Sequence, residues 1–440
     1  MKQSILKRGL LYICIFACLT LLQLGSLVLV ALIPTATLQS NMEESADFLC
    51  ENFVFRQFDS RHSGSIIDRY ADSILLNVLY SYDSERPVES VLDASYYYSV
   101  DENENFNLYT AVYENAPANK SYSRYWHGSI VLLRPLLVCF NLQQIYVILG
   151  IILCLLFLVL LVLICRKLKW TAIIPVLLGG ILMSFWYVPF SLEYTWTILL
   201  MLITSIIILL LSENQPPTLI TIIFLITGSM TAFMDFLSTE TLTLLVPLTI
   251  YLAITYQKHE ITTFRDGFQK LLPMGIGWLV GYAGTWLSKW TIASLVLQEN
   301  VFASAMAQAG ERISGDVEVT GFAKYPATII QNLNCIWPFN YAETNGYLLV
   351  LVLFLVVGII YFLFRKKSEQ SICLLYLLLA LVPYIRFIAL SNHSFIHYFF
   401  TYRTQFATVL CLGIILIYGL DWELIQKECK KLWRKMPWRK

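Results

Sequence analysis

Two carboxylates stand four residues apart in the stretch DRYADSILLN, which begins at Asp68. If this stretch is helical, Asp68 and Asp72 lie on the same face of the helix. Two close carboxyl groups raise each other's pKa, so that one of them can accept a proton near neutral pH. Such a group can act as the general base that activates an attacking hydroxyl. The alternative is a solvated helix on which Asp68 pairs with Arg69, and the sequence leaves both interpretations open.

A second group of ionisable residues lies in the stretch RFIALSNHSFIHYFFTYR, which runs from Arg386 to Arg403. On a helix, His393 and His397 share a face, and a histidine pair can bind a phosphate, bind a metal or shuttle protons. A metal needs at least one further ligand, and none lies nearby in the sequence. Contact with a phosphate or a lipid headgroup is therefore favoured over a metal site, with plain structural hydrogen bonding as the alternative.

Further cations fall close to the same predicted membrane face. Arg124 and His127 lie in the stretch SRYWHG, Arg134 follows it, and Lys289 lies within an apolar run. Ionisable residues inside or at the edge of a membrane span are costly and are functional candidates for that reason. The group predicts an anionic ligand, such as a lipid phosphate, at this face. The alternatives are snorkelling to headgroups and ion pairs with the acids Glu193, Asp235 and Glu240.

The elements that position these residues are predicted to be membrane-spanning helices. The chain has 440 residues, of which 57% are hydrophobic and 14% charged. Its apolar residues form runs of about twenty, the length that crosses the hydrocarbon of a bilayer. We therefore predict an all-α polytopic membrane protein with about ten transmembrane helices. The predicted spans are 10–33, 144–164, 172–189, 196–211, 218–236, 241–256, 272–295, 346–364, 371–390 and 401–420.

Charge is divided between the two sides of these spans. Nineteen of the 31 Lys and Arg residues fall at the two ends of the chain or in alternate connections between spans. The positive-inside rule then places both termini in the cytoplasm and predicts a multi-pass protein of the cell membrane. The opposite, extracytoplasmic side is acidic, with 15 Asp and Glu against 7 Lys and Arg in residues 34–143. A nucleic-acid partner is not expected, because the basic clusters only flank the spans.

The predicted organisation has six parts. They are an N-terminal anchor helix at 1–33, an extracytoplasmic loop with surface helices at 34–143, a transmembrane bundle at 144–296, a second extracytoplasmic loop at 297–345, C-terminal transmembrane helices at 346–420 and a basic cytoplasmic tail at 421–440.

Within the first loop the sequence indicates several short elements. We expect an amphipathic surface helix over 41–58, a helix over 66–82, strand character over 92–113 and a surface or re-entrant helix over 128–142. The second loop is expected to begin as a helix and to end as a loop over the site.

The pattern resembles the glycosyltransferases of the GT-C fold, which have a large outer loop with an acidic motif after the first span. Four stretches resemble a group of largely uncharacterised bacterial membrane proteins that are GT-C-like: DRYADSILLN (68–77), SRYWHGSIVLLRPLL (123–137), MTAFMDFLSTETLTLLVPL (230–248) and NHSFIHYFFTYR (392–403).

The resemblance implies a role for individual residues. The catalytic base would be Asp72, with Asp68 as the other candidate, and the phosphate contacts would include Arg124, His127, His393, His397 and Arg403. Many GT-C enzymes place an adjacent acidic pair closer behind the first span. The adjacent pair of this chain is Glu43 and Glu44, which leaves the identity of the base open.

The function that the resemblance implies is an inverting transfer of a hexosyl or pentosyl group from a polyprenyl-phosphate donor. The acceptor would be a glycan, lipid or protein of the cell envelope, beside membrane lipid as a general partner. No cofactor is expected, although a divalent metal is not excluded. The alternatives are a transporter or flippase for a lipid-linked or anionic solute, and a non-catalytic assembly protein of the cell envelope.

Overall fold

The computed structural model describes residues 2–60, 62–211, 215–315, 319, 321–336 and 346–434. These residues are almost entirely helical. One small antiparallel sheet in this part of the chain pairs β1 (Phe55–Gln57) with β2 (Ile66–Asp68), and its register sets Phe55 opposite Asp68. The prediction of an all-α architecture is thus confirmed at the level of fold class.

Seven helical stretches of the described chain are long and apolar enough to cross a membrane. They lie on α1 (Lys2–Ala31), α7 (Leu142–Lys167), α9 (Leu192–Leu211), α10 (Pro217–Met234), α15 (Gly346–Phe364), α16 (Gln370–Ala389) and the stretch that comprises α18 (Tyr398–Thr401) and α19 (Phe406–Gly419). The predicted spans 172–189 and 241–256 fall on shorter apolar helices, α8 (Ile173–Leu182) and α11 (Leu242–Gln257). The span 272–295 lies within the 34-residue helix α12 (Phe264–Leu297). These long apolar helices indicate a membrane-embedded protein.

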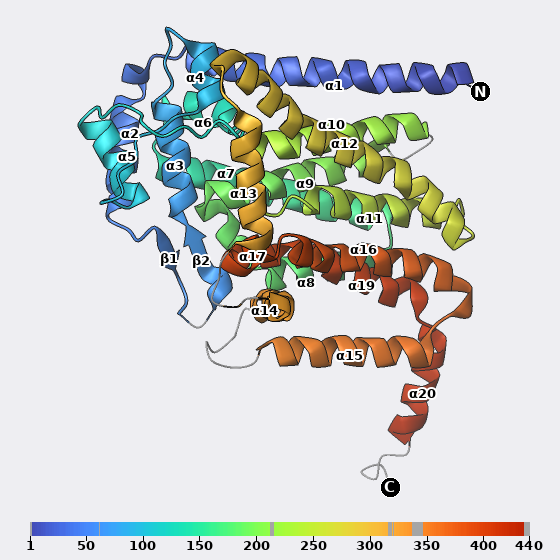
Figure 1. Cartoon of the computed structure of the whole chain (residues 1–440). Helices are drawn as coiled ribbons and strands as arrows, with labels where there is room; N and C mark the ends of the chain where they lie inside the picture. The colour runs from blue at the N-terminus through green and yellow to red at the C-terminus, as the bar shows by residue number, and fades with distance from the viewer. Residues whose placement is uncertain are drawn as a thin grey trace.

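The long helices lie side by side, and the shorter elements gather at one end of them (Figure 1). This end carries α2 (Gln39–Cys50), α3 (Arg69–Tyr80), α4 (Pro87–Asp93), α5 (Glu104–Tyr113), α6 (Ile130–Leu137), α13 (Val301–Ser314), α14 (Lys324–Asn334) and α17 (Ser391–Ile396). The first residues of α1 and the C-terminal end of α19 lie at the opposite end, where α20 (Trp422–Arg434) follows α19. Residues from the predicted loops and from the ends of the spans can therefore meet at one end of the bundle.

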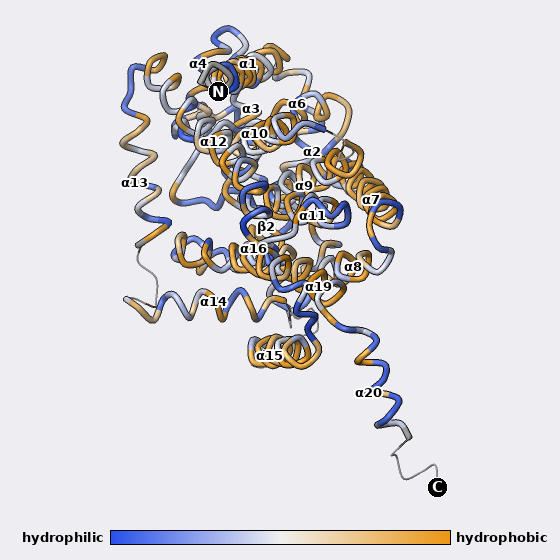
Figure 2. The backbone as a smooth tube through the Cα atoms, turned by 90° about the vertical axis from the view of Figure 1, so that its right-hand side faces the viewer, coloured by the Kyte–Doolittle hydropathy of each residue, from blue (hydrophilic) through white to orange (hydrophobic). Residues whose placement is uncertain are grey.

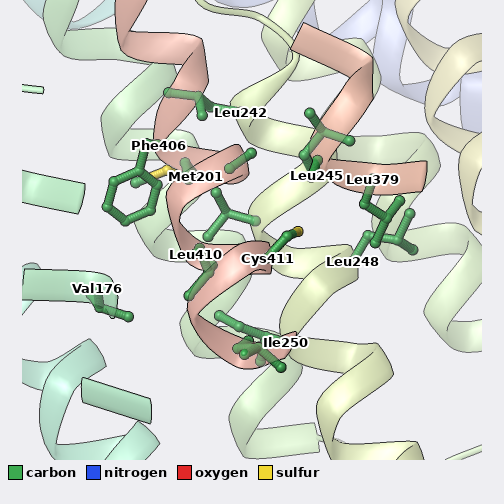
Figure 3. Close-up of a cluster of buried hydrophobic side chains, with 14 of the residues drawn as sticks. Val176, Met201, Leu242, Leu245, Leu248, Ile250, Leu379, Phe406, Leu410 and Cys411 are labelled. Atoms are coloured by element: carbon green, nitrogen blue, oxygen red, sulfur yellow. The ribbon is translucent and has the colours of Figure 1, made fainter. Parts of the chain in front are cut away.

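The centre of the bundle is a cluster of buried aliphatic side chains. Figure 3 shows Met201 of α9, Leu245 of α11 and Leu410 of α19 in this cluster, and none of the three is more than 2% exposed. The outer helices are also rich in hydrophobic residues (Figure 2), and many of these are exposed, such as Leu155 of α7 at 58% and Leu355 of α15 at 63%. An apolar exterior around an apolar core is the pattern of a helix bundle that is surrounded by lipid.

Glycine allows a very close backbone contact between α10 and α12. A Cβ atom on Gly228 would lie 2.0 Å from the backbone oxygen of Trp278, and one on Gly281 would lie 2.1 Å from that of Leu225. Any side chain at these positions would force the two helices apart. Small residues at the contact are the usual basis of tight helix pairing in membranes.

Four local predictions differ from the structure. The strand character expected over 92–113 is limited to an isolated antiparallel bridge between Tyr96 and Lys120. Most of the segment is helical, because α4 ends at Asp93 and the side chain of Asn103 caps α5 by accepting from two backbone amides. The predicted span 172–189 stops at Leu182, because Ser184 has a φ of 50° and a 3-10 helix follows. Strands β1 and β2 replace the ends of the helices predicted over 41–58 and 66–82.

The remaining loop predictions hold in part. Helix α6 occupies the middle of 128–142. The second loop begins with α13, as expected, but a second helix, α14, follows it. Residues 337–345, at the end of this loop, lie outside the described residues.

Candidate functional site

A cavity of about 120 Å³ opens where the loop elements meet the ends of the spans. Its walls come from α3, α9, α13 and α17, together with the loop that follows α10. Its acidic and basic side chains are Asp68, Glu193, Arg312, His393 and His397, and Tyr70, Tyr122 and Tyr125 add phenol groups. Acidic residues from the first half of the chain and basic residues from the second half thus line the same cavity.

The acidic wall is formed by Asp68 and Glu193. Asp68 caps α3, since its Oδ1 accepts a hydrogen bond of 2.9 Å from the backbone amide of Ala71. The side chains of Asp68 and Glu193 also share a hydrogen bond, and they are 2% and 6% exposed. A hydrogen bond between two carboxyl groups requires a proton between them. Burial raises the pKa of Asp68 from 3.8 to about 6, which brings its ionisation close to neutral pH.

The basic wall is formed by Arg312 and the two histidines. Arg312 of α13 donates to the hydroxyl of Tyr125, while its Nη1 has no hydrogen-bond partner among the described residues. The rings of His393 and His397 lie 4.7 Å apart, and Nε2 of His393 lies 2.9 Å from the carbonyl oxygen of Leu237. Nδ1 of His397 is buried and likewise finds no partner in the described chain. Buried donors of this kind are suited to an anionic group in the cavity.

The histidines are neutral at physiological pH. Burial lowers the pKa of His397 to about 4, and the nearby charges of Arg312 and Arg386 act in the same direction. The pKa of His393 is lowered for the same reasons, burial first and then its neighbour His397. Each neutral imidazole carries one N–H, and that of His393 donates to the carbonyl oxygen of Leu237, so His397 is the histidine that can donate into the cavity. Arg312 brings the fixed positive charge of this wall.

Asp72, the residue that the sequence favoured as base, lies outside the cavity. It is fully buried and accepts hydrogen bonds of 2.9 and 3.1 Å from the backbone amide of Leu192, a longer one from Glu193 and one from the hydroxyl of Tyr146. It therefore binds the free amides at the start of α9, where a negative charge also favours the helix dipole. Asp72 positions Glu193, and Asp68 is the one of the two aspartates that faces the cavity.

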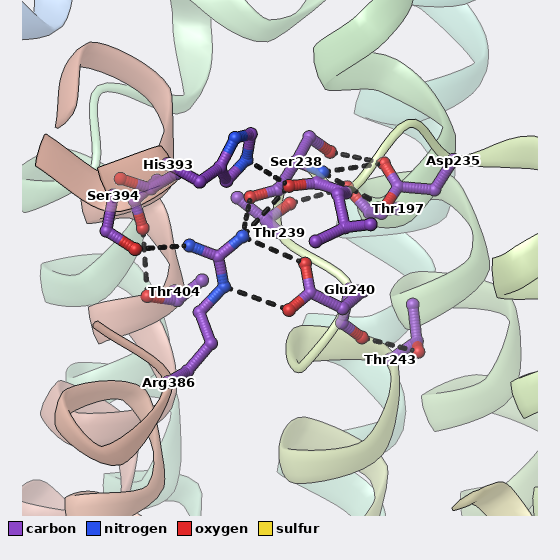
Figure 4. A network of polar contacts seen from close by, with 12 residues as sticks. Thr197, Asp235, Ser238, Thr239, Glu240, Thr243, Arg386, His393, Ser394 and Thr404 are labelled. Carbon is purple, nitrogen blue, oxygen red and sulfur yellow. Dashed lines mark hydrogen bonds and ion pairs between the residues drawn. The ribbon is translucent and has the colours of Figure 1, made fainter. Parts of the chain in front are cut away.

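Arg386 stands behind the histidines and is bound on every side (Figure 4). Its Nε lies 2.9 Å from Oε1 of Glu240 and its Nη1 2.9 Å from the hydroxyl of Ser394. Its Nη2 donates to the carbonyl oxygen of Leu237 at 2.9 Å, the same oxygen that faces His393. Leu237 has a φ of 73°, a left-handed conformation that costs energy in a leucine. The network thus holds the loop after α10 and, through it, His393.

Arg134 and Lys289 bind the carbonyl ends of helices. Arg134 donates to the carbonyl oxygens of Leu79, in the last turn of α3, and of Ile33, beyond the end of α1. Lys289 donates to those of Val91 and Leu92 in α4, at 3.0 and 2.8 Å. Both side chains are fully buried, and neither lines the cavity. Cations at helix C-termini satisfy free carbonyls and favour the helix dipole.

Arg403, Arg124 and His127 lie one layer away from the cavity. Arg403 donates to the carbonyl oxygen of Gly64 at 3.0 Å, and its guanidinium lies over the ring of Tyr194. Arg124 and His127 both pack on the ring of Tyr122, which lines the cavity. Arg124 and His127 therefore lie behind the aromatic part of the wall, whereas the contacts of Arg403 are with residues that do not line the cavity.

Two of the acidic and basic residues that line the cavity were not predicted as site residues. Glu193 was considered only as an ion-pair partner, because it falls at the start of an apolar run. Arg312 lies in the second loop, where it is one of only two basic residues among 297–345. That isolation in an acidic segment is the signal that could have identified it. The alternative acids Glu43 and Glu44 lie on α2, where they bind Gln39 and Asn141, and they do not line the cavity.

The remaining observations are negative ones. Within the described ranges, no three His, Cys, Asp or Glu side chains lie close enough together to hold a metal ion. In the comparisons with known proteins, no family model, no curated protein and no solved structure matches this sequence.

Proposed function

We propose that this chain is a GT-C-like membrane glycosyltransferase that moves a sugar from a polyprenyl phosphate to an acceptor outside the cytoplasm. The observation that carries the proposal is the cavity in which Asp68 and Glu193 face Arg312 and His397. A carboxylate can take a proton from the acceptor, and the cationic wall can stabilise the departing phosphate. The resemblance of the sequence to GT-C enzymes points to the same chemistry.

The proposed reaction is a single displacement. The oxygen of the acceptor hydroxyl forms a bond to the anomeric carbon of the sugar, and its proton passes to the carboxylate of Asp68. The bond from this carbon to the phosphate oxygen breaks, and its electron pair leaves with the polyprenyl phosphate. Arg312 and the N–H of His397 stabilise the charge on that phosphate, while His393 keeps its own N–H on the carbonyl oxygen of Leu237. Attack opposite the leaving group inverts the configuration of the sugar.

The proposed orientation puts the cavity outside the cytoplasm. Basic clusters flank the ends of the spans away from the cavity, and the positive-inside rule assigns those ends to the cytoplasm of a cell membrane. The loops 34–143 and 297–345 then face the cell envelope, whose glycans, lipids or proteins would supply the acceptor. The donor would come from the outer leaflet.

The test is a transfer assay with purified protein in proteoliposomes and a radiolabelled polyprenyl-phosphate sugar. We expect label to move to an acceptor extracted from the cell envelope, with release of polyprenyl phosphate. Movement of the intact lipid-linked sugar across the bilayer, with no bond cleaved, would instead identify a transporter. Full complementation of a deletion strain by Asp68→Asn would identify a non-catalytic assembly protein.

The pH dependence of transfer follows from the state of Asp68. As a base it must be ionised, and its pKa is raised to about 6 by burial. We therefore expect kcat/KM to be highest above this pH and to fall tenfold per pH unit well below it. The neutral histidine His397, whose pKa is about 4, adds no second limb between pH 5 and 8. A profile that is flat from pH 5 to 8 would contradict the assignment of Asp68.

Arg312 is expected to act on the leaving phosphate. Replacing it by Gln removes the fixed positive charge of the cavity and should lower kcat by about 100-fold, the effect of losing one donor to a developing anion. Arg312→Lys keeps the charge but loses the planar fork, so that we expect an intermediate rate. The matched control is Arg86→Gln, because Arg86 is a surface residue of the same outer region. Equal rates for the two Gln variants would exclude this role.

A further inference from the structure

Among the long apolar helices of the described chain, α15 packs least against the rest of the protein. Only 6% of its apolar stretch is buried, against 44% for the stretch that includes α16 and 67% for α9. Its main contacts are with α14 near one end and with α20 near the other. In the view down the bundle, α15 stands apart from the other helices (Figure 2). Something other than the protein must therefore fill the space along its middle.

Two large apolar grooves occupy that space, one on each side of α15. The first, of about 670 Å³, lies between α15, α8 and α19, and the second, of about 680 Å³, lies between α15, α16 and α19. Phe354, Val357 and Leu412 line both of them, so the grooves meet between α15 and α19. Their walls are almost wholly aliphatic and aromatic. Cavities of this kind exclude water, and in a bilayer they take hydrocarbon.

Both grooves end at a basic side chain on the side opposite the candidate site. Lys169 and Trp422 line the first groove, and Arg365 and Gln370 line the second. These ends of the two grooves lie close to each other along the chain ends of α15 and α19, because Arg365 and Leu420 form an antiparallel β-bridge. A cation beside an interfacial tryptophan, at the mouth of an apolar groove, is the chemistry that recognises an anionic lipid headgroup.

Helix α20 extends this basic surface. It runs at a steep angle to the spans and leads past the end of α15 away from the bundle (Figure 1), and hydrophilic and hydrophobic residues alternate along it (Figure 2). Trp422, Ile425 and Trp433 fall on one helical face, whereas Lys427, Lys430 and Lys431 fall on the other. This is the pattern of a helix that lies in the membrane interface and faces anionic lipids.

We propose that the grooves on either side of α15 bind an anionic glycerophospholipid of the cytoplasmic leaflet. Its acyl chains fill the two grooves, and its phosphate lies between Lys169 and Arg365. The lipid replaces the missing protein contacts of α15 and joins this helix to α8, α16 and α19. The proposal does not depend on the reaction at the candidate site.

The experiment compares two lipids on the purified full-length chain in a neutral detergent. Phosphatidylglycerol and phosphatidylcholine with the same acyl chains are titrated, and the thermal midpoint Tm is measured by tryptophan fluorescence. We expect phosphatidylglycerol to raise Tm by about 3 °C, because a ligand that binds only the folded state stabilises it. An equal rise with phosphatidylcholine would overturn the proposal, and this comparison needs no variant.

Variants then locate the headgroup. In Lys169→Gln/Arg365→Gln the rise with phosphatidylglycerol should fall to less than a third, and Lys169→Arg/Arg365→Lys should retain it. The matched control is Arg166→Gln, an exposed charge at the same end of the bundle that lines neither groove. A full rise in the first double variant, or an equal loss in the control, would show general attraction to a basic surface and would reject the site.

Discussion

Asp68→Asn is expected to reduce sugar transfer by about 100- to 10,000-fold, the range in which a positioned general base contributes. The substitution is well matched, because Asn caps a helix as well as Asp does and can still accept from the amide of Ala71. The start of α3 and the shape of the cavity are therefore retained. What is lost is the group that accepts a proton at about pH 6. The measurement is kcat in proteoliposomes, beside Tm of the same preparation.

Two further variants make this result specific. Asp101→Asn changes an exposed acid of the same loop and should leave transfer unchanged. Asp68→Ala removes both the base and the helix cap, so that we expect the same loss of kcat together with a lower Tm. Wild-type turnover in Asp68→Asn would remove the proposed base. A low Tm in that variant would assign its loss of activity to the fold.

The exchange of roles between Asp68 and Asp72 shows what spacing alone can and cannot predict. Four residues on a helix place both carboxylates on one side, and the structure has a helix there, α3. The spacing does not say which carboxylate meets the N-terminus of another helix. Asp72 meets the first amides of α9, and Asp68 meets the cavity. The partner of Asp72 lies 120 positions further along the chain, beyond the reach of any local pattern.

The long helices were the most predictable part of the fold, because their length is set by the bilayer and their composition by lipid. The predicted span 346–364 coincides with α15 (Gly346–Phe364), and 371–390 is displaced by one residue from α16. The short elements of the first loop were less predictable. Their limits depend on caps and turns, such as Asn103 at the start of α5, which a hydropathy pattern does not register.

Among the predicted cations, hydropathy could not separate those that face a cavity from those that hold the fold together. Lys289 and Arg134 satisfy carbonyl oxygens at helix ends, and His393 and His397 line the cavity. All four are costly to bury for the same reason, so the sequence marks them alike. Only the fold shows which of them already has its partners. Arg312 was missed because it lies in a loop, where a charge has no cost that would mark it.

Arg386→Met is expected to cause the largest loss of stability of any single substitution at this end of the bundle. Arg386 and Glu240 are 5% and 7% exposed in their side chains and form an ion pair at 2.9 Å. Methionine fills similar space but leaves Glu240 buried without its counter-charge. Breaking a buried pair from one side costs about 3–5 kcal/mol. The measurement is the free energy of unfolding in mixed micelles, taken from denaturant titrations of the wild type and the variant.

The double variant Arg386→Met/Glu240→Leu tests whether the loss of stability comes from leaving the charge of Glu240 buried without a partner. It removes both charges, so that we expect it to be more stable than Arg386→Met alone. Recovery should be incomplete, because the carbonyl oxygen of Leu237 and the hydroxyl of Ser394 also lose a partner. If the double variant were no more stable than Arg386→Met, the unpaired charge of Glu240 would not be the cause of the loss. The backbone contacts of Arg386 with the loop after α10 would then account for it, and their loss should also release His393 and lower the rate of transfer.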